Sequence, residues 1–335
     1  MILALDLGGS QIRTAALEHG GPIRARRRAP TPVEAGPQAV VSACTDLLSA
    51  TYEELKAGES GRVATAVGVS APGPLDSRSG VLIDPPNLGR SFRDIALGAA
   101  IEESIGLPAV IERDTNVAAM AEGEHGAAVG RRDYLYITVS TGIGGAIVSD
   151  GRLLMGADGT AGELGHLPVD MDGPRCGCGG RGHLEAIASG TAIARAGREA
   201  GERGESPLLA TLLADAGAMF EARHVVEAEG AGDAVATAIM ERARGAFAAV
   251  CVGLVDVFNP ELIVVGGSLA QAQVDRWLEP ARQAIAHSGF RTPARRAKLV
   301  PAALGDDVGL VGAACLVEGR RESGRWPLSG ATGGH

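Results

Sequence analysis

Four side chains that can bind a metal lie close together in residues 160–185, TAGELGHLPVDMDGPRCGCGGRGHLE. They are His166, Cys176, Cys178 and His183. Thiolate and imidazole ligands suit tetrahedral Zn²⁺, and the glycines between them allow a short loop to fold back on the ion. Four protein ligands would fill a structural site and leave no position for water. The alternative is two reduced cysteines in a glycine-rich loop with two unrelated surface histidines, and the spacing favours zinc.

A second group of polar residues follows a strand predicted at residues 109–112. The strand ends in Glu112-Arg113-Asp114-Thr115-Asn116, and a helical segment comes next. A carboxylate at the end of a parallel strand, just before a helix, lies where open α/β sheets carry out their chemistry. Asp114 is therefore a candidate for proton transfer. The alternative is that Asp114 is the N-cap of the helix, a position that aspartate often occupies.

Two glycine-rich turns follow the same pattern of strand, turn and returning strand. The first joins strands predicted at 2–5 and 12–17 through Asp6-Leu-Gly-Gly-Ser-Gln11, and the second joins strands at 134–139 and 146–149 through Ser140-Thr-Gly-Ile-Gly-Gly145. Glycines allow backbone amides to approach a phosphate closely, and a hydroxyl can add a donor. One such turn could be an ordinary hairpin turn. The repetition indicates a duplicated fold with one phosphate hairpin in each half.

Other segments must position these residues. A strand at 63–69 leads into Ser70-Ala-Pro-Gly-Pro, and the following loop closes on Asn87. A strand at 262–265 leads into Gly266-Gly267-Ser268 and then into a helix. Further helices are predicted at 37–56, 93–105, 186–199, 208–227, 233–258 and 306–319.

Length and composition limit the class of protein. A chain of 335 residues is long enough for two domains, and the net charge of −9 argues against nucleic acid as the main partner. No run of about 18 apolar residues predicts a membrane span, and the first residues lack the pattern of a signal peptide. Cys44, Cys251 and Cys315 lie in apolar segments and are predicted to be buried free thiols. We therefore expect a cytoplasmic protein without a membrane partner.

The order Gly165-His166, nine residues, C-x-C-G-x-x-G, one ligand and then x-Glu185 resembles the zinc signature of the ROK family of repressors and sugar kinases. Five motifs in family order extend this resemblance from Ile2 to about Val317. Three positions depart from the family pattern. His183 stands where the family usually has cysteine, Arg113 replaces an asparagine, and Gln11 often corresponds to lysine.

The resemblance implies an α/β fold of the actin-like (ribonuclease H-like) type, duplicated as two domains around a cleft. Its expected boundaries are residues 1–115 plus about 304–320 for a small domain and 116–303 for a large domain with the zinc loop. Residues 321–335 are expected to be a disordered tail. Dimers are usual in the family, so a homodimer is expected.

The implied activity is transfer of the γ-phosphoryl group of ATP to a sugar hydroxyl, with Mg²⁺ as cofactor and Zn²⁺ as a structural ion. Asp114 would be the general base. His166 would bind both zinc and the sugar. The implied sugar-binding residues are Gly73, Asn87, Arg113, Glu163, His166 and Glu185. The implied contacts to ATP and Mg²⁺ are Asp6, Gly8, Gly9, Ser10, Gln11, Thr141, Gly142, Gly144, Gly266 and Gly267.

Glucose is the sugar that the resemblance favours, with glucose 6-phosphate as the product. N-acetylhexosamines, fructose, mannose and C7-cyclitols are the alternative acceptors. A different class is the sugar-responsive regulator without catalysis. Such regulators carry a helix-turn-helix domain before the first phosphate hairpin, and here that hairpin begins at residue 2, so we expect a kinase.

Overall fold

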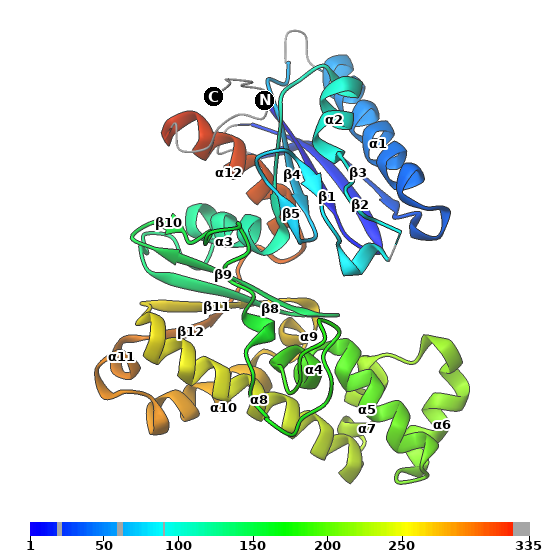
Figure 1. Ribbon diagram of the computed structural model, residues 1–335, viewed down its shortest axis with the longest axis vertical. Coiled ribbons are helices and arrows are strands. Elements are labelled where there is room, and N and C mark those ends of the chain that lie inside the picture. Colours follow the sequence, from blue (N-terminus) through cyan, green and yellow to red (C-terminus); the bar gives the residue numbers. More distant parts are fainter. Residues whose placement is uncertain (19–21, 59–62, 90, 324–335) are drawn as a thin grey trace. The chain divides into compact units, whose positions relative to one another are not determined.

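The computed structural model describes residues 1–18, 22–58, 63–89 and 91–323 (Figure 1). The chain folds into two compact units. Unit 1 contains Met1–Gly130, Met155–Thr160 and the segment that begins at Leu304. Unit 2 contains Arg131–Leu154 and Ala161–Ala303.

The elements of unit 1 comprise one main sheet, a small hairpin and four helices among the described residues. The strands are β1 (Ile2–Leu7), β2 (Gln11–Leu17), β3 (Ile23–Pro30), β4 (Val67–Ala71), β5 (Leu75–Asp76), β6 (Val81–Leu82) and β7 (Ala109–Arg113). The helices are α1 (Pro37–Gly58), α2 (Leu97–Ile105), α3 (Asp114–His125) and α12 (Val308–Ser323). Single 3₁₀ turns lie at Val33–Ala35, Pro86–Leu88 and Gly305–Asp307.

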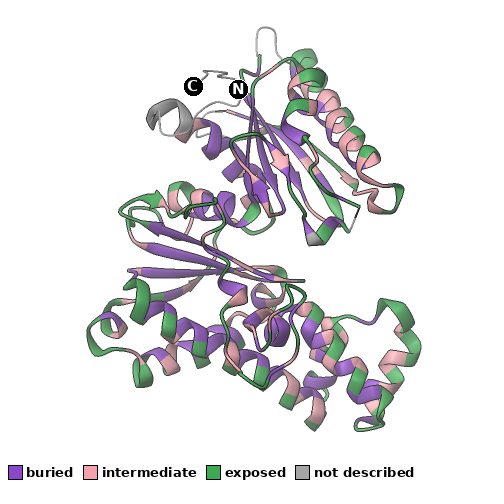
Figure 2. Cartoon of the chain, in the orientation of Figure 1, coloured by how far each residue is buried: buried purple, intermediate pink, exposed green. Residues whose placement is uncertain are grey.

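The main sheet of unit 1 has the strand order β3-β2-β1-β4-β7. Strands β1, β2 and β3 form an antiparallel meander, and β4 and β7 continue the sheet in parallel with β1. The side chains of β1 alternate between the two faces. Leu3 and Leu5 pack in the layer of α1 and α2, whereas Ile2 and Ala4 pack with α12. Figure 2 shows buried strands beside α1, whose outer face is exposed, whereas residues 308–319 of α12 are buried or half-buried.

Unit 2 repeats this sheet with different helices. Its strands are β8 (Tyr134–Val139), β9 (Ile143–Ser149), β10 (Arg152–Leu153), β11 (Leu262–Gly266) and β12 (Lys298–Pro301). Its helices are α4 (Leu184–Ala188), α5 (Gly190–Glu202), α6 (Pro207–Ala216), α7 (Ala222–Gly230), α8 (Ala234–Phe258), α9 (Ser268–Gln271), α10 (Val274–Ser288) and α11 (Arg291–Arg296). Its 3₁₀ turns are Leu164–His166 and Gly217–Met219.

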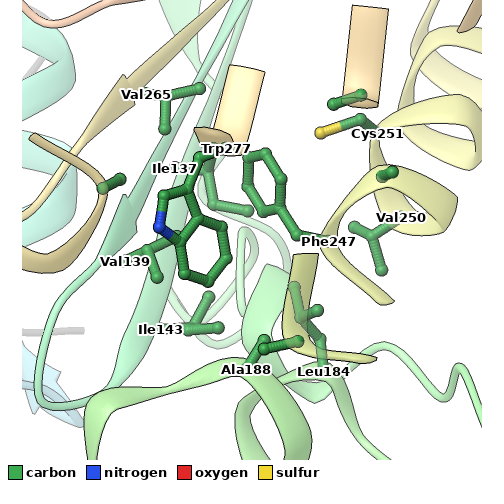
Figure 3. Packing of buried hydrophobic residues seen from close by; sticks show 14 of the residues in the cluster. Ile137, Val139, Ile143, Leu184, Ala188, Phe247, Val250, Cys251, Val265 and Trp277 are labelled. Atoms are coloured by element: carbon green, nitrogen blue, oxygen red, sulfur yellow. The ribbon is translucent and has the colours of Figure 1, made fainter. Parts of the chain in front are cut away.

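The second sheet has the order β10-β9-β8-β11-β12, again an antiparallel meander followed by two parallel strands. Each strand thus has a counterpart in unit 1, so the duplication predicted from the two glycine-rich turns is present in the folded chain. The core of unit 2 lies between this sheet and helices α8 and α10. Trp277 and Phe247 meet there edge to face, with ring centroids 5.6 Å apart (Figure 3).

Most predicted elements are confirmed, with several corrections. The segments predicted as helical at 186–199 and 208–227 are each divided into two helices, α4 with α5 and α6 with α7. The strand predicted at 63–69 begins only at Val67. Strands β3 and β12 were missed. Most side chains of β3 are exposed, and its arginines give it no apolar alternation. Such charges protect the edge of a sheet from further pairing.

The first segment of unit 1 runs to Gly130, and α3 packs on α12 within this unit. At the C-terminus, α12 continues to Ser323, so the predicted tail at 321–335 begins as helix. The remainder of that prediction, from residue 324, lies outside the described residues.

The three cysteines predicted to be buried free thiols, Cys44, Cys251 and Cys315, are buried and unbridged. Burial raises the pKa of Cys44 to about 12, so this thiol stays protonated at neutral pH. Among the described helices, none is both long enough and apolar enough to cross a membrane.

The approach of α12 to α3 can be tested at Gly312. A Cβ there would lie 2.1 Å from the carbonyl oxygen of Val117, so Gly312→Ala should force the helices apart and lower the thermal transition. Overpacking of this kind costs roughly 1–3 kcal/mol. Gly253→Ala is the matched control, because a Cβ within α8 meets no atom within 4 Å and alanine favours helix by up to about 1 kcal/mol.

Calorimetry of the two variants should show a decrease for Gly312→Ala and an unchanged or raised transition for Gly253→Ala. A Gly312→Ala protein at least as stable as wild type would contradict the close helix packing.

Candidate active site

Glu112 holds the turn at which β7 becomes α3. Its carboxylate is only 1% exposed. Oε1 accepts hydrogen bonds from the backbone N–H of Arg113 at 2.8 Å and from Nδ2 of Asn116 at 3.0 Å, and Oε2 accepts from the Ser77 hydroxyl at 2.9 Å. This buried carboxylate therefore fixes the backbone on both sides of Asp114.

Asp114 is the first residue of α3 and is exposed, although both of its neighbours are buried. Its Oδ1 accepts a hydrogen bond from the Thr115 N–H at 2.7 Å. The helix N-terminus favours a negative charge at this position. The N-cap residue is Arg113, so the alternative that Asp114 is the cap is wrong. The side chain is thus exposed, and hydrogen bonds to Glu112 hold the backbone on both sides of it.

Arg113 is buried, with 3% of its surface exposed, so its side chain does not turn outward to the solvent. Its Nη2 lies 3.4 Å from Oδ1 of Asn116. A Cβ at Gly73 would lie 2.8 Å from Cδ of Arg113, so the absence of a side chain at Gly73 makes room for the arginine. The structure thus brings together Gly73, Arg113 and Asp114.

The first glycine-rich turn lies against Asn87. The turn is closed by a hydrogen bond from the Gly8 N–H to the Gln11 carbonyl at 2.9 Å, and Ser10 and Gln11 are exposed at its tip. A Cβ at Gly9 would lie 2.8 Å from the carbonyl oxygen of Asn87. Only glycine fits this approach, which brings a predicted phosphate contact next to a predicted sugar contact.

Asp6 has a partner that the sequence analysis missed. It is 7% exposed, and its Oδ2 accepts a hydrogen bond from Nη2 of Arg13 at 2.5 Å. Nη1 of Arg13 donates to the carbonyl oxygen of Asp306 at 2.6 Å. Asp6 and Arg13 are direct partners across β1 and β2, so the hairpin register was the signal that could have revealed this pair. Any cation at Asp6 would share its carboxylate with Arg13.

The second turn, in unit 2, is surrounded by two other segments. The Ser140 N–H donates to the Gly142 carbonyl at 2.9 Å, and Gly144 lies in β9 opposite Thr138. The carbonyl of Thr141 accepts hydrogen bonds from the N–H of Thr191 at 3.1 Å and from its hydroxyl at 2.9 Å.

The segment that follows β11 also reaches this turn. Gly266 ends β11, and Gly267 is the N-cap residue of α9. The hydroxyls of Ser140 and Ser268 lie 2.9 Å apart. The turn, the start of α5 and the start of α9 therefore meet at one place, although they are far apart in the sequence.

A cavity of about 660 Å³ opens beside these segments within unit 2. Its lining includes the predicted residue Thr141 and several residues that the sequence analysis missed, among them Thr191, Arg198, Phe220, Ser268 and Gln273. No motif marks most of them, because they come from separate helices. Ser268 was visible as the residue after Gly266-Gly267.

Gln273 is oriented by a buried ion pair. Glu229 accepts hydrogen bonds from Nη1 and Nη2 of Arg244 at 2.6 and 2.9 Å, and the same Nη2 lies 2.6 Å from Oε1 of Gln273. Arginine can only donate, so the amide oxygen of Gln273 faces Arg244.

Two predicted sugar-binding carboxylates also lie in unit 2. Glu163 is exposed and precedes the 3₁₀ turn Leu164–His166. Glu185 is half-buried in α4, and its Oε2 accepts a hydrogen bond from the Ile143 N–H at 3.0 Å. Oε1 of Glu185 lies 4.0 Å from Sγ of Cys176. Glu185 therefore connects the second glycine-rich turn with the predicted metal ligands.

The four predicted zinc ligands come together in the folded chain. Their ligand atoms all lie within 4.8 Å of one another. Nδ1 of His166 is 3.6 Å from Sγ of Cys176, and Nδ1 of His183 is 3.3 Å from Sγ of Cys178. Sulfur and nitrogen ligands of a tetrahedral zinc lie roughly 3.5 Å apart, given bonds of about 2.3 and 2.0 Å. The donor set and its spacing fit zinc.

Comparison with known proteins places the chain in a family. The model of the ROK family matches residues 2–320. The chain belongs to the ROK family. The glucokinase of Thermotoga maritima is 32% identical over 95% of this chain and 98% of its own length. The N-acetylmannosamine kinase of Citrobacter koseri is 35% identical over 95% of this chain and 98% of its own length.

A solved ROK structure supports the same fold. The Streptomyces griseus ROK glucokinase, in complex with glucose and AMPPNP, has a TM-score of 0.77 and is 32% identical, covering 94% of this chain and 98% of that one. The predicted ROK membership and actin-like fold are confirmed. The protein is an ATP-dependent sugar kinase, a phosphotransferase with an alcohol group as acceptor. The roles of individual residues, the zinc ion, the domain boundaries, the homodimer and the cytoplasmic location stay predictions.

The metal cluster gives a direct test. Burial raises the pKa of the Cys176 thiol, and a bound cation would favour its thiolate form. Elemental analysis after dialysis should find one tightly held zinc per chain. Cys178→Ala should lower both zinc content and thermal stability, because removing a ligand opens a closed site.

Cys44→Ala is the control, because Cys44 is a buried thiol of unit 1 outside this cluster. It should keep its zinc even if it loses some stability. Full zinc occupancy in Cys178→Ala would show that the assignment of four ligands is wrong.

Proposed function

We propose that the protein phosphorylates glucose with ATP and forms glucose 6-phosphate. The observation that carries this proposal is the similarity, along nearly the whole chain, to ROK glucokinases of Thermotoga maritima, Halalkalibacterium halodurans and Streptomyces griseus. The residues that would perform the reaction occur at the matching motifs, apart from the departures at Gln11, Arg113 and His183.

Asp114 is the proposed general base. It accepts the proton of the attacking sugar hydroxyl as the oxygen forms its bond to the γ-phosphorus and the bond to ADP breaks. Such transition states are loose, so the protein acts mainly by positioning and by stabilising charge. The exposed carboxylate, its rigid backbone and the helix N-terminus support this role, because they present an ionised oxygen without reorganisation.

Each unit contains residues with a proposed role in sugar binding. In unit 1 they are Gly73, Asn87 and Arg113. In unit 2 they are Glu163, His166 and Glu185, whose oxygens and ring nitrogen accept hydrogen bonds from sugar hydroxyls. His166 directs Nδ1 toward Cys176, which leaves Nε2 as the ring nitrogen for the sugar. A zinc ion bound by His166, Cys176, Cys178 and His183 would fix the tautomer of this ring and has a structural role.

The proposed nucleotide contacts are the two glycine-rich turns and the start of α9. Asp6 would hold Mg²⁺, directly or through water, and the ion would neutralise phosphate charge. In unit 2 the cavity beside Thr141 and Gly267 supports a nucleotide site, because hydroxyls and helix starts converge on it. Phe220 is in the lining of this cavity, and its buried ring stacks on that of His224.

N-acetylmannosamine is the second candidate acceptor, because kinases for this sugar are 35% identical to the chain over nearly its whole length. The two proposals are separated by one experiment. Purified protein is supplied with ATP and a panel of glucose, mannose, fructose, N-acetylhexosamines and cyclitols, and ADP formation is measured. Glucose should give the highest kcat/KM. A higher value for N-acetylmannosamine or a cyclitol would overturn the proposal of glucose while leaving the kinase activity intact.

Asp114→Asn should remove most of kcat, because the amide cannot accept the proton. General-base contributions are typically about 10²- to 10⁴-fold. ATP binding, measured by calorimetry, should stay close to that of wild type. The control is Asp94→Asn, an exposed aspartate of the same unit outside the motifs. Turnover of Asp114→Asn within a few-fold of wild type would exclude the role of general base.

Arg113→Asn should change the order of preference among acceptors. Arginine only donates hydrogen bonds and is always charged, so it favours an acceptor atom on the substrate and rejects an ammonium group. Asparagine can both donate and accept hydrogen bonds and carries no charge. The ratio of kcat/KM for glucosamine to that for glucose should rise in the variant. An unchanged order of substrates, in a variant shown by circular dichroism to be folded, would exclude Arg113 from substrate recognition.

A further inference from the structure

Three residues with metal-binding side chains meet at the end of α3 that is far from Asp114. They are His125, Cys315 and Glu318, all in unit 1. One ligand atom from each lies within 4.8 Å of the other two. Cys315 was predicted only to be a buried thiol, and the proposed kinase mechanism uses none of the three.

The packing of two helices brings these side chains together. Cys315 and Glu318 lie three residues apart on α12 and therefore share one face of that helix. His125 is the last residue of α3. The two helices pack closely at Gly312 and Val117, and Leu316 is buried in the same contact. The three ligands are thus held by packed helices, whereas a chance surface cluster depends on mobile loops.

The C-terminal end of α3 is also anchored. Glu122 is fully buried, and its carboxylate accepts hydrogen bonds from the Ala127 N–H at 2.7 Å and from the Leu304 N–H at 3.0 Å. These bonds tie the residues on each side of His125 to the segment that leads into α12. The separation between His125 and the two residues of α12 is therefore set by the fold.

A small cavity gives access to this group. Its volume is about 180 Å³, and His125 and Glu318 are in its lining together with Glu18. Cys315 is 3% exposed, Glu318 is half-buried and His125 is exposed. Cys315 is not in the lining, but its thiol lies within 4.8 Å of ligand atoms of both His125 and Glu318. The cavity also has room for a water molecule beside the ion.

We propose that His125, Cys315 and Glu318 form a second zinc site, distinct from the cluster in unit 2, with water as the fourth ligand. One nitrogen, one sulfur and one oxygen ligand are a set that Zn²⁺ accepts. Tetrahedral bonds of about 2.0–2.3 Å place donor atoms roughly 3.3–3.8 Å apart, so the side chains must close by about 1 Å. The exposed imidazole of His125 can make this adjustment by rotation.

This site differs from the cluster of unit 2 in its expected affinity for zinc and in its role. It has three protein ligands and one thiolate, whereas the cluster has four protein ligands and two thiolates, so its zinc exchanges more readily. An ion here joins α12 to α3 and stabilises unit 1. Asp114 lies at the other end of α3, about 17 Å away at 1.5 Å per residue. The ion therefore has no part in phosphoryl transfer.

Zinc titration in competition with a chromophoric chelator tests the proposal. Wild-type protein should bind a second equivalent more weakly than the first. His125→Ala should lose the second equivalent and keep the first. Cys178→Ala should lose the first and keep the second. His287→Ala is the matched control, because it is also an exposed histidine in the last turn of a helix, α10. It should keep both equivalents.

Cys315→Ser gives an independent variant, checked for folding by circular dichroism. Cobalt added to Cys178→Ala should produce a thiolate charge-transfer band that His125→Ala or Cys315→Ser removes. The proposal is overturned if wild type binds only one zinc, or if the second equivalent survives both variants or is lost equally in His287→Ala. These measurements do not use turnover, so their outcome is independent of the acceptor sugar.

Discussion

The close packing of α12 on the first sheet and on α3 is the constraint on which unit 1 depends. A Cβ at Gly68 of β4 would lie 1.8 Å from the carbonyl oxygen of Ala313, and one at Gly312 would lie 2.1 Å from that of Val117. The backbone of α12 therefore packs directly against the backbone of β4 on one side and of α3 on another. Because α12 is formed by the last described residues, the sheet built by the first residues has an uncovered face until nearly the whole chain is present. Burying this face of the sheet therefore requires contacts between residues that are distant in the sequence.

The duplicated sheet explains how similar local patterns acquire different tasks. Each unit places a glycine-rich turn between the first two strands of its meander. In unit 1 this turn is covered by Asn87 and lies next to the ion pair of Asp6 and Arg13. In unit 2 it meets the starts of α5 and α9 and borders a cavity. The two sheets have the same arrangement of strands, and the segments that contact the glycine-rich turn differ between the units.

Local patterns predicted much of the fold and of the candidate site, because their signals lie within short stretches. Strand β1, its turn and β2 were recognisable from apolar runs around two glycines, and the four residues of the predicted zinc cluster from their spacing. Strand β3 was not predicted because an exposed, arginine-rich edge strand lacks apolar periodicity. Another reason explains why no role was predicted for Arg13, for Gln273 or for the group of His125 and Cys315. Their significance depends on partners that are distant in sequence, and only tertiary packing supplies those partners.

Burial was also hard to predict at the centre of the site. Arg113 and Asp114 are adjacent charged residues, yet the first is buried and the second exposed. The turn from strand to helix determines this difference, because successive side chains leave the end of β7 in different directions. Glu112 stabilises the turn through three hydrogen bonds. Of these three consecutive charged residues, Glu112 is buried and supports the turn, Arg113 is buried, and Asp114 is exposed.

The pairing of Asp6 with Arg13 has an electrostatic consequence for the approach of a nucleotide. An isolated carboxylate next to Gly8 and Gly9 would repel the polyanionic tail of ATP before any favourable contact formed. Arg13 balances this charge in the free protein, and about a third of its own side chain remains exposed. A triphosphate at this hairpin would therefore meet a locally neutral surface with a guanidinium at its border. The pair would reduce the repulsion of an anion there, although the protein as a whole carries a net charge of −9.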